Sequence, residues 1–293
     1  VISGGDRKKL TPAKHRLANN HIHHYGRRGT SYPGVDMDGV GIHVVHNSIH
    51  DAPHTGIQFM GNDHVIELNE IHHVCSETSD AGAIYTGRDW TVAGNLIRHN
   101  FIHDVVGMDN KGDVIAIYLD DLASGTSITG NVLARVRQGV KIGGGRDNTV
   151  QNNVFANCDT SFSVDARGVT WGPKFLAADG VLRKRLDRLP YQTPPWSTRY
   201  PQLSQILSDD PGIPKRNLVQ SNLMYRCGQT SVNPIARLYG TIQDNWETDS
   251  NPGFHDVDTN NFSLKRDAPV EAKIPGWESI PFREIGVHPA TGE

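Results

Sequence analysis

The chain has 293 residues, a formal net charge of −3 and 21% charged residues. This balance lacks the basic excess that marks proteins which bind nucleic acid or anionic membranes, so we expect neither as a partner. No apolar run approaches the roughly 20 residues that span a bilayer, and three cysteines are too few and odd in number for a disulfide framework. Thirty glycines and 7% aromatic residues indicate a chain rich in tight turns.

An internal repeat organises most of the chain. An asparagine followed two residues later by an aliphatic or aromatic residue recurs at Asn20, Asn47, Asn69, Asn100, Asn131, Asn153 and Asn222. The base interval is 22 residues, and two intervals are 31 residues. This period predicts an all-β fold, a right-handed single-stranded parallel β-helix whose coils each hold about three short strands. Asparagine suits the turns because it tolerates the left-handed conformation and can bond along the axis to the next asparagine.

A second strand signature, with period-two alternation, falls between the asparagine frames. Its copies are Gly56–Phe59, Gly82–Tyr85, Ala116–Leu119, Gly139–Ile142 and Ser161–Val164. The side chains that we expect inside the solenoid are Ile57, Phe59, Ile117, Leu119, Val140 and Ile142. Those that we expect along one outer face are Gln58, Ile84, Tyr118, Lys141 and Ser163.

Two segments interrupt the repeat. Residues 168–216 predict a helical and loop excursion that leaves the solenoid after Val164 and returns at Leu218. Residues 251–293 combine prolines with short apolar pieces and predict a cap over the open end, which would otherwise expose unpaired strand edges. We interpret residues 1–293 as a single domain and as a monomer, with further coils expected before Val1.

The two 31-residue intervals carry insertions that should bracket a groove on one face, and function in a solenoid is expected at such interruptions. The first insertion is Cys75–Gly82, and the second surrounds the strand at 114–119. The acids of this region and of the following coil are Glu77, Asp80, Asp89, Asp120, Asp121 and Asp165. The basic and aromatic side chains that we expect to bind a substrate with them are His54, Tyr85, Arg88, Tyr118, Lys141, Arg146 and Arg167.

Paired carboxylates beside arginines in an open groove suit glycoside hydrolysis, in which one acid protonates the leaving oxygen and the other activates water or attacks the sugar. Asp120 and Asp121 are adjacent, so one of their pKa values would rise unless arginine or substrate compensates the charge. A hydrogen-bonded turn or a calcium site is the alternative interpretation of that pair. For the Arg-Asp pairs at 88–89 and 146–147, the alternative is an ion pair that staples a turn.

A column of histidines is expected on the outside of the solenoid. His23, His50, His72 and His103 each follow an asparagine of the repeat by three residues. We interpret them as a surface ladder and not as a metal site, because no cysteine or carboxylate joins them at ligand spacing. No metal ion or cofactor is predicted, and calcium remains an alternative.

The ordered series of motifs resembles a known family. The motifs are "DAPHTGIQFMGNDHVIELNEIHHVCSETSDAGAIYTGRDW", "YLDDLASG", "IGGGRDN", "VDARGVTW", "PPWSTRYPQL" and "NPGFHDVDTNNFSLK". Together they cover roughly residues 19–290 and resemble the β-helical enzymes of glycoside hydrolase family 141. The resemblance implies an exported bacterial enzyme, secreted, periplasmic or on the cell surface, that acts on a plant polysaccharide. The activities it implies are α-L-fucosidase on pectin and endo-xylanase.

The resemblance also implies an aspartate pair as the catalytic groups, with Asp80 of "SDAG" and Asp121 of "YLDD" as the best matches and Asp120 as the alternative partner. In strict register, seven or more strand residues at about 3.3 Å each would separate Asp80 from Asp121. That separation is too long for either hydrolase mechanism. The pairing therefore requires the insertion Cys75–Gly82 to fold back over the strand.

Two other functions stay open at this point. The first is a polysaccharide lyase with Lys141 or Arg146 as the base and calcium held by the acids. The second is a non-catalytic solenoid for carbohydrate binding or surface adhesion, which would bind sugars through exposed aromatic rings.

Overall fold

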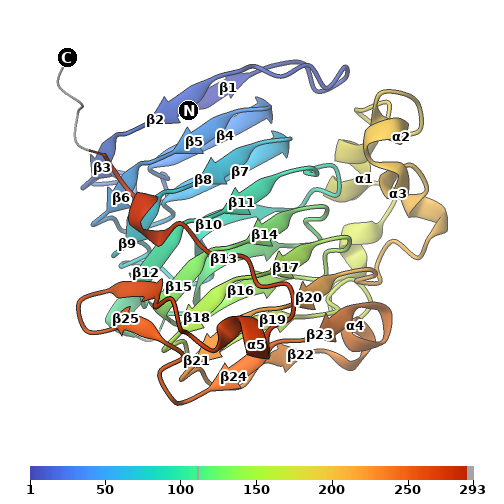
Figure 1. The fold of residues 1–293 in the computed structure, drawn as a ribbon. Coiled ribbons are helices and arrows are strands. Elements are labelled where there is room, and N and C mark those ends of the chain that lie inside the picture. Colours follow the sequence, from blue (N-terminus) through green and yellow to red (C-terminus); the bar gives the residue numbers. More distant parts are fainter. Residues whose placement is uncertain (111, 289–293) are drawn as a thin grey trace.

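The computed structural model describes residues 1–110 and 112–288, and the chain in it winds as a parallel β-helix (Figure 1). Each coil contributes one strand to each of three parallel sheets, so strands three apart in the sequence are hydrogen-bonded neighbours. The first sheet consists of β1 (Ile2–Gly4), β4 (Val35–Val40), β7 (Ile57–Asn62), β10 (Ala81–Gly87), β13 (Val114–Asp120), β16 (Gln138–Ile142), β19 (Thr160–Val164) and β22 (Ser231–Val232).

The other two sheets are built from shorter strands. The second sheet consists of β2 (Arg16–Ala18), β5 (His43–Val45), β8 (Val65–Glu67), β11 (Leu96–Arg98), β14 (Ser127–Thr129), β17 (Thr149–Gln151), β20 (Leu218–Gln220) and β23 (Thr241–Gln243). The third consists of β3 (His21–His23), β6 (Ser48–His50), β9 (Glu70–His72), β12 (Phe101–Val105), β15 (Val132–Val136), β18 (Val154–Ala156), β21 (Leu223–Tyr225) and β24 (Trp246–Thr248). This arrangement confirms the predicted solenoid.

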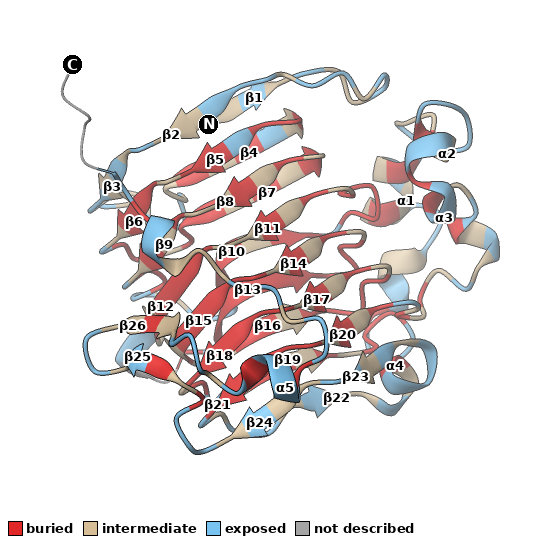
Figure 2. Ribbon diagram, in the orientation of Figure 1, coloured by how far each residue is buried: buried red, intermediate tan, exposed pale blue. Residues whose placement is uncertain are grey.

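Side chains from all three sheets fill the interior of the solenoid with one continuous apolar core. Figure 2 shows buried residues along the strands of successive coils. The six residues that the alternation assigns to the interior are all buried in this core. The prediction for Ile84 was wrong, because Ile84 is paired with Ile57 and Ile117 and is buried with them. Its neighbour Ala83 also belongs to the core, so the strict alternation is broken there and Tyr85 takes the outer position.

An asparagine ladder runs along the bend between the second and third sheets. Within it the Asn100 backbone N–H donates to Asn131 Oδ1 at 3.0 Å, and the Asn131 amide donates to the Ile97 carbonyl at 3.0 Å. The backbone N–H bond to the next asparagine recurs from Asn20 to Asn245, and each side-chain amide also donates to the next Oδ1, which confirms the predicted stacking. The left-handed residue of each turn is the one before the asparagine, such as His99 with φ 53°. The prediction that the left-handed conformation selects asparagine at the ladder positions was therefore wrong, and the ladder hydrogen bonds are what the asparagines supply.

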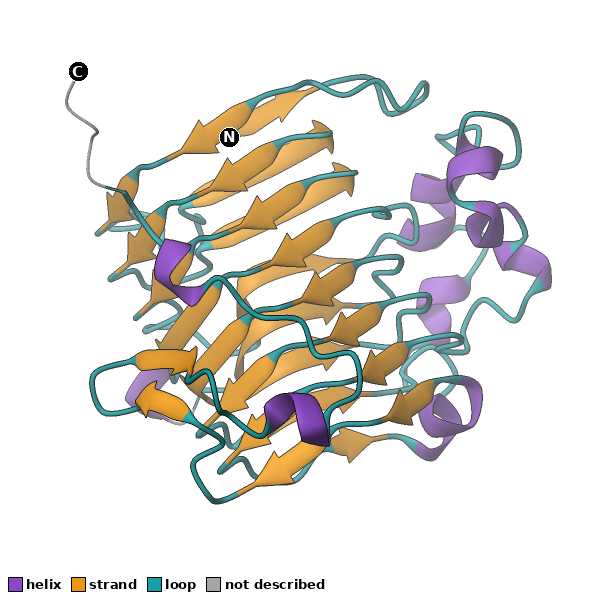
Figure 3. Ribbon diagram, viewed as in Figure 1, coloured by secondary structure: helices purple, strands orange, loops and turns teal. Residues whose placement is uncertain are grey.

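The excursion after β19 is a set of short helices beside the solenoid (Figure 3). They are the 3-10 turns Pro173–Leu176 and Ile206–Ser208 and the helices α1 (Val181–Leu186), α2 (Trp196–Arg199) and α3 (Pro201–Ser204). Apolar side chains of these helices, with Trp196 at their centre, pack on Trp90 and Leu122 from the turns that follow β10 and β13. The excursion is thereby fixed at the end of the first sheet where its strands finish.

The C-terminal segment covers a flank of the solenoid. It contains the two-stranded sheet β25 (Phe254–Asp256) and β26 (Asn261–Leu264), the helix α5 (Val270–Lys273) and the 3-10 turn Phe282–Glu284. Its apolar side chains pack on the outer face of the third sheet, around Phe101 and Tyr225, whereas the sequence predicts a cap over the open end. Helix α4 (Pro234–Tyr239), which comes before this segment in the chain, packs its buried Ala236 against the main core. Residues 289–293 of the predicted cap lie outside the described residues.

The C-terminal segment also returns toward the first coil. Glu278 exchanges two hydrogen bonds with the Asn152 side chain, each at 2.8 Å. Farther along, the His288 N–H donates to Asn19 Oδ1 at 2.7 Å. The last coil and the first coil are therefore tied together by one strap.

The four predicted ladder histidines stack on the third sheet. The ring centroids are 5.2 Å apart for His23 and His50, 4.6 Å for His50 and His72, and 4.8 Å for His72 and His103. The predicted column is therefore confirmed. Within residues 1–110 and 112–288, no three or more His, Cys, Asp or Glu side chains form a group that could hold a metal ion.

Candidate functional site

The outer face of the first sheet carries a row of polar and aromatic side chains. The pairing register places Tyr85 beside Gln58 and Tyr118, and it continues from Tyr118 through Lys141 to Ser163. Parallel strands in register stack equivalent side chains into such rows, because residues at the same position in successive coils point the same way. The row therefore collects side chains that are 22 to 33 residues apart in the sequence.

The insertion Cys75–Gly82 folds back over this row. Its backbone is held to the second insertion by hydrogen bonds from the Asp80 N–H to the Asp113 carbonyl at 2.7 Å and from the Asp113 N–H to Ser79 Oγ at 3.0 Å. The Tyr118 hydroxyl donates to Asp80 Oδ1 at 3.3 Å. Tyr118 points outward, yet it is only 2% exposed. The Asp80 carboxylate therefore reaches Tyr118 in the middle of the outer row.

A buried ionic cluster lies at the other end of β13, where the strand finishes. Arg167 Nη1 donates to Asp120 Oδ1 at 2.5 Å and to Asp121 Oδ1 at 2.8 Å, and Arg167 Nη2 contacts Asp165 Oδ2 at 2.7 Å. Arg88 Nε donates to the other Asp121 oxygen at 2.7 Å. Because Asp120 and Asp121 are both nearly buried, removal of Arg167 would leave Asp120 without a counter-ion and Asp121 with Arg88 alone.

Asp120 differs from Asp121 in the group that binds its second oxygen. The Tyr85 hydroxyl donates to Asp120 Oδ2 at 2.9 Å, which ties Asp120 to the outer row. A Cβ added at Gly87 would lie 2.9 Å from Asp120 Cβ and 3.1 Å from the Tyr85 hydroxyl. Glycine at this position therefore permits the Tyr85–Asp120 contact. Asp121 instead has both oxygens bound by arginines.

The two tyrosines of the row stay protonated. Burial raises the pKa of Tyr85, and the negative charge of Asp120 raises it further. Burial likewise raises the pKa of Tyr118, with Asp120 as the second cause and Arg167 acting in the opposite direction. Both hydroxyls are therefore hydrogen-bond donors toward carboxylates at neutral pH, and both Asp80 and Asp120 accept such a bond.

A pocket of about 470 Å³ adjoins the cluster on the same outer face. It is lined by Lys141, Ser163, Asp165 and Asn233 among others. Lys141 is half-buried, its ammonium 3.5 Å from Asp113 Oδ2 and 5.2 Å from the centre of the Tyr118 ring. Asp165 is shared between the pocket and the Arg167 cluster, so the pocket and the cluster form one continuous site.

A second and larger pocket of about 730 Å³ lies on the outer face toward the first coils. It is bounded by Asp38 and Met60 on the sheet and by Arg185 and Arg188 on the excursion. Arg185 Nη1 donates to the Gly87 carbonyl at 3.2 Å, and Gly87 is paired with Asp120 in the sheet. Sequence reasoning missed Arg185, because only the folded excursion brings residue 185 to residue 87.

Several predicted site residues lie elsewhere. Asp89 is buried and accepts hydrogen bonds from the Thr91 N–H at 2.8 Å and the Thr91 hydroxyl at 2.6 Å, so it shapes a turn. Arg88 pairs with Asp121, and not with Asp89 as the turn-staple interpretation proposed. Half-buried His54 contacts the hydroxyl of its neighbour Thr55, and exposed Glu77 lines a separate pocket of about 440 Å³ with His73 and Asp51.

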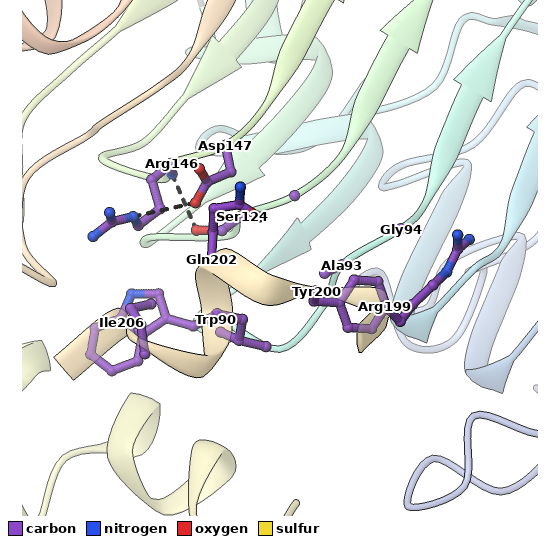
Figure 4. A pocket seen from close by; sticks show the side chains of 12 residues that line it. Trp90, Ala93, Gly94, Ser124, Arg146, Asp147, Arg199, Tyr200, Gln202 and Ile206 are labelled. Atoms are coloured by element: carbon purple, nitrogen blue, oxygen red, sulfur yellow. Dashed lines mark hydrogen bonds and ion pairs between the residues drawn. The ribbon is translucent and has the colours of Figure 1, made fainter. Parts of the chain in front are cut away.

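Arg146 is also outside the outer row. It lines a fourth pocket, of about 240 Å³, between the turns of the solenoid and the excursion (Figure 4). Its Nη1 donates to the Asp209 carbonyl at 2.7 Å, its Nη2 binds the Asp209 carboxylate, and its Nε contacts Asp147 at 3.3 Å. The guanidinium is thereby saturated by protein partners, and it fastens the excursion to the solenoid.

The comparisons with known proteins agree with the architecture. Residues 33–171 match the family model described as a right handed beta helix region. This match covers the coils that hold both insertions and the Arg167 cluster. A search of curated proteins finds no match to the chain. The chain is a right-handed parallel β-helix, a fold compatible with enzymes that act on polysaccharides. No helix of the described part is both long and apolar enough to cross a membrane.

Proposed function

We propose that the chain is a glycoside hydrolase that cleaves a plant cell-wall polysaccharide or oligosaccharide on the outer face of the first sheet. The observation that carries the proposal is the arrangement of Asp80 and Asp120 about Tyr118. Asp80 accepts from the Tyr118 hydroxyl, and Asp120 lies two residues along the same strand and accepts from Tyr85. Two carboxylates beside an open face are the groups that glycoside hydrolysis requires.

We assign different roles to the two carboxylates. Asp120 is fixed by Arg167 and Tyr85, and its compensated negative charge suits the group that activates water or attacks the sugar. Asp80 is exposed at the end of the insertion, directly before β10, and it contacts the row through Tyr118. We therefore propose Asp80 as the proton donor. Asp121 is bound by two arginines and serves to position Arg167.

This pairing replaces the Asp80–Asp121 pair with the alternative partner. Asp121 binds Arg88 and Arg167 and has no contact with either tyrosine of the row. Asp120 accepts a hydrogen bond from Tyr85, and its charge adds to burial in raising the pKa of Tyr118. We propose Lys141, Asp165 and Arg167 as the groups that bind sugar hydroxyls beside the reacting bond. Secretion to the cell exterior and a monomeric state remain part of the proposal.

The test is hydrolysis of a panel of xylan, fucosylated pectin and their oligosaccharides, measured as the release of reducing ends. Asp80→Asn and Asp120→Asn should each lower the rate by about 10²–10⁴-fold, since each removes a group that transfers a proton or attacks the sugar. The matched control is Asp267→Asn, which changes an exposed carboxylate on the C-terminal segment and should leave the rate unaltered. Melting temperatures of all three variants establish that they fold.

The same panel separates the competing functions. A polysaccharide lyase would release unsaturated uronates with new ultraviolet absorbance, and Lys141→Met would abolish them. A non-catalytic binding solenoid would retain glycans in affinity electrophoresis without releasing reducing ends. Either result, or full activity in both aspartate variants, would overturn the proposed hydrolase.

A further inference from the structure

Trp171 is an exposed aromatic ring at the edge of the candidate site. Its exposed fraction is 60%, whereas Trp90 and Trp196 are buried and Trp246 and Trp277 are half-buried. It lies in the turn that starts the excursion, four residues after Arg167. A single exposed apolar side chain needs no functional explanation by itself, but this ring is held in place by charged and aromatic neighbours.

The ring is held by two neighbouring side chains. The Arg167 guanidinium lies 5.2 Å from the ring centre, a cation–π contact, and the Phe175 ring lies nearly perpendicular to it with centroids 5.8 Å apart. The turn itself is closed by the Gly172 N–H, which donates to the Arg167 carbonyl at 2.7 Å. The ring is therefore supported by Arg167 and Phe175 while 60% of the residue stays exposed.

Arg167 also sets the distance between the ring and the carboxylates. The same guanidinium that supports Trp171 binds Asp120 at 2.5 Å and Asp165 at 2.7 Å. Summed with standard bond lengths, these contacts place the ring centre within about 9 Å of Asp120 Oδ1. Asp165 in turn lines the pocket of about 470 Å³. The ring therefore stands near the reacting carboxylate, and Arg167 links it to Asp165 at the adjoining pocket.

We infer that Trp171 is a sugar-stacking platform that binds one pyranose ring of an oligosaccharide next to the residue cleaved at Asp120. The apolar C–H face of a pyranose packs on an exposed aromatic face, while its hydroxyls reach Asp165 and Lys141 at the rim of the pocket. Support by Arg167 holds the platform in place before the sugar arrives, which reduces the entropy lost on binding. This inference rests on the proposed function for the position of the cleaved bond.

The kinetic test compares Trp171→Ala, Trp171→Phe and Tyr32→Ala. Tyr32 is the matched control, since it is an aromatic ring 71% exposed on the loop before β4. Trp171→Ala should raise KM about tenfold with kcat nearly unchanged, because stacking is lost equally from ground and transition states. Trp171→Phe should retain most of the affinity, and Tyr32→Ala should equal the wild type. An unaltered KM in Trp171→Ala would overturn the inference.

A binding test works without catalysis. Xylohexaose, cellohexaose and a hexamer of galacturonic acid are titrated in turn while acrylamide quenches tryptophan fluorescence. At least one hexamer should protect the wild type and Tyr32→Ala from quenching. The same hexamer should give no protection in Trp171→Phe, because that variant lacks the tryptophan whose fluorescence reports the contact. Protection without hydrolysis would sustain the platform and refute the proposed hydrolase. Hydrolysis with no protection by any hexamer would refute the platform and sustain the hydrolase.

Discussion

The Tyr118 hydroxyl donates to Asp80 Oδ1 at 3.3 Å, although residue 80 precedes β10 and residue 118 lies near the end of β13. This one contact joins the end of an insertion to the middle of the outer row. It fixes the direction of the exposed Asp80 carboxylate, which then points toward the row. The site consequently depends on how the insertion folds as much as on the solenoid beneath it.

We therefore expect Tyr118→Phe to lower kcat about tenfold, because the variant removes the hydrogen bond that orients Asp80 and keeps the ring that fills the space under the insertion. Steady-state hydrolysis of the best substrate in the panel measures the effect. Melting should change little, since the ring remains. A kcat equal to that of the wild type would show that Asp80 needs no such support.

Removal of Arg167 should unfold the site. Arg167→Met leaves the carboxylates of Asp120 and Asp121 buried without a shared counter-charge, which should lower the free energy of unfolding by about 3–5 kcal/mol. Urea denaturation measures the loss. The triple variant Asp120→Asn, Asp121→Asn and Arg167→Met should recover part of it, because the like charges are then gone. A loss under about 1 kcal/mol for Arg167→Met alone would contradict the assigned cluster.

The asparagine ladder should be most sensitive at its centre. Asn131→Ala deprives the Asn100 N–H and the Ile97 carbonyl of their partners and should cost about 2–4 kcal/mol of unfolding free energy. Asn245→Ala, at the half-exposed last rung, should cost about 1 kcal/mol because water can replace the lost bonds. Equal losses at the two positions in urea denaturation would show that the ladder does not stabilise through burial.

The excursion should detach when Arg146 is replaced. Arg146→Met breaks the bonds to Asp209 and Asp147, so residues 168–216 should open locally while the solenoid keeps its far-ultraviolet circular dichroism. Limited proteolysis should then cleave within that segment at least tenfold faster than in the wild type. Lys174→Met, an exposed change in the same segment, is the control. Cleavage at the wild-type rate would indicate that apolar packing alone holds the excursion.

The histidine ladder should make stability depend on pH. Burial, with His103 as the next cause, lowers the pKa of His72 to about 4. The unfolded state, with a pKa near 6.5, then binds a proton that the folded state refuses, so stability falls as the pH drops from about 6.5 toward 4. Because His72 is half-exposed, we expect an effect of only about 1 kcal/mol.

His72→Gln should therefore flatten the loss of melting temperature between pH 7 and pH 4.5. His103 provides the opposite sign, since Asp104 and Glu70 outweigh its burial and raise its pKa. Its contribution is present at low pH and is lost as the pH rises through the raised pKa. His103→Gln should thus remove stability mainly at acidic pH. Parallel melting curves for the two variants across this range would refute the assignment.

Much of the solenoid follows from periodicity. The 22-residue asparagine frame predicts the coils and the ladder, because one hydrogen-bonding side chain at a fixed turn can only satisfy its neighbours if the coils stack in register. The inward positions of Ile57, Ile117 and Val140 follow from alternation, but Ile84 does not. Ala83 and Ile84 both point inward, and a prediction from strict alternation cannot detect two consecutive inward residues.

The site was less predictable than the fold. Charge and spacing were enough to select Asp80, Asp120, Tyr85 and Arg167. Acids that lie beside arginines in an insertion cost stability unless they have a function. The distinction between Asp120 and Asp121 could not be made in this way, because adjacent residues at a strand end point in different directions. The motif "VDARGVTW" contained Trp171, but sequence alone did not reveal an exposed ring supported by Arg167.

By itself, the sequence determined the class of fold, the position of the coils from Asn20 to Asn222 and the segments that interrupt them, but it missed the last rung at Asn245. Those properties are local and repeat from coil to coil, so spacing records them. Tertiary structure alone decided that the Cys75–Gly82 insertion covers Tyr118, that Arg146 anchors the excursion and that the C-terminal segment lies along the third sheet. Such contacts join residues far apart in the chain through irregular segments, and irregular backbone has no period from which its direction could be read.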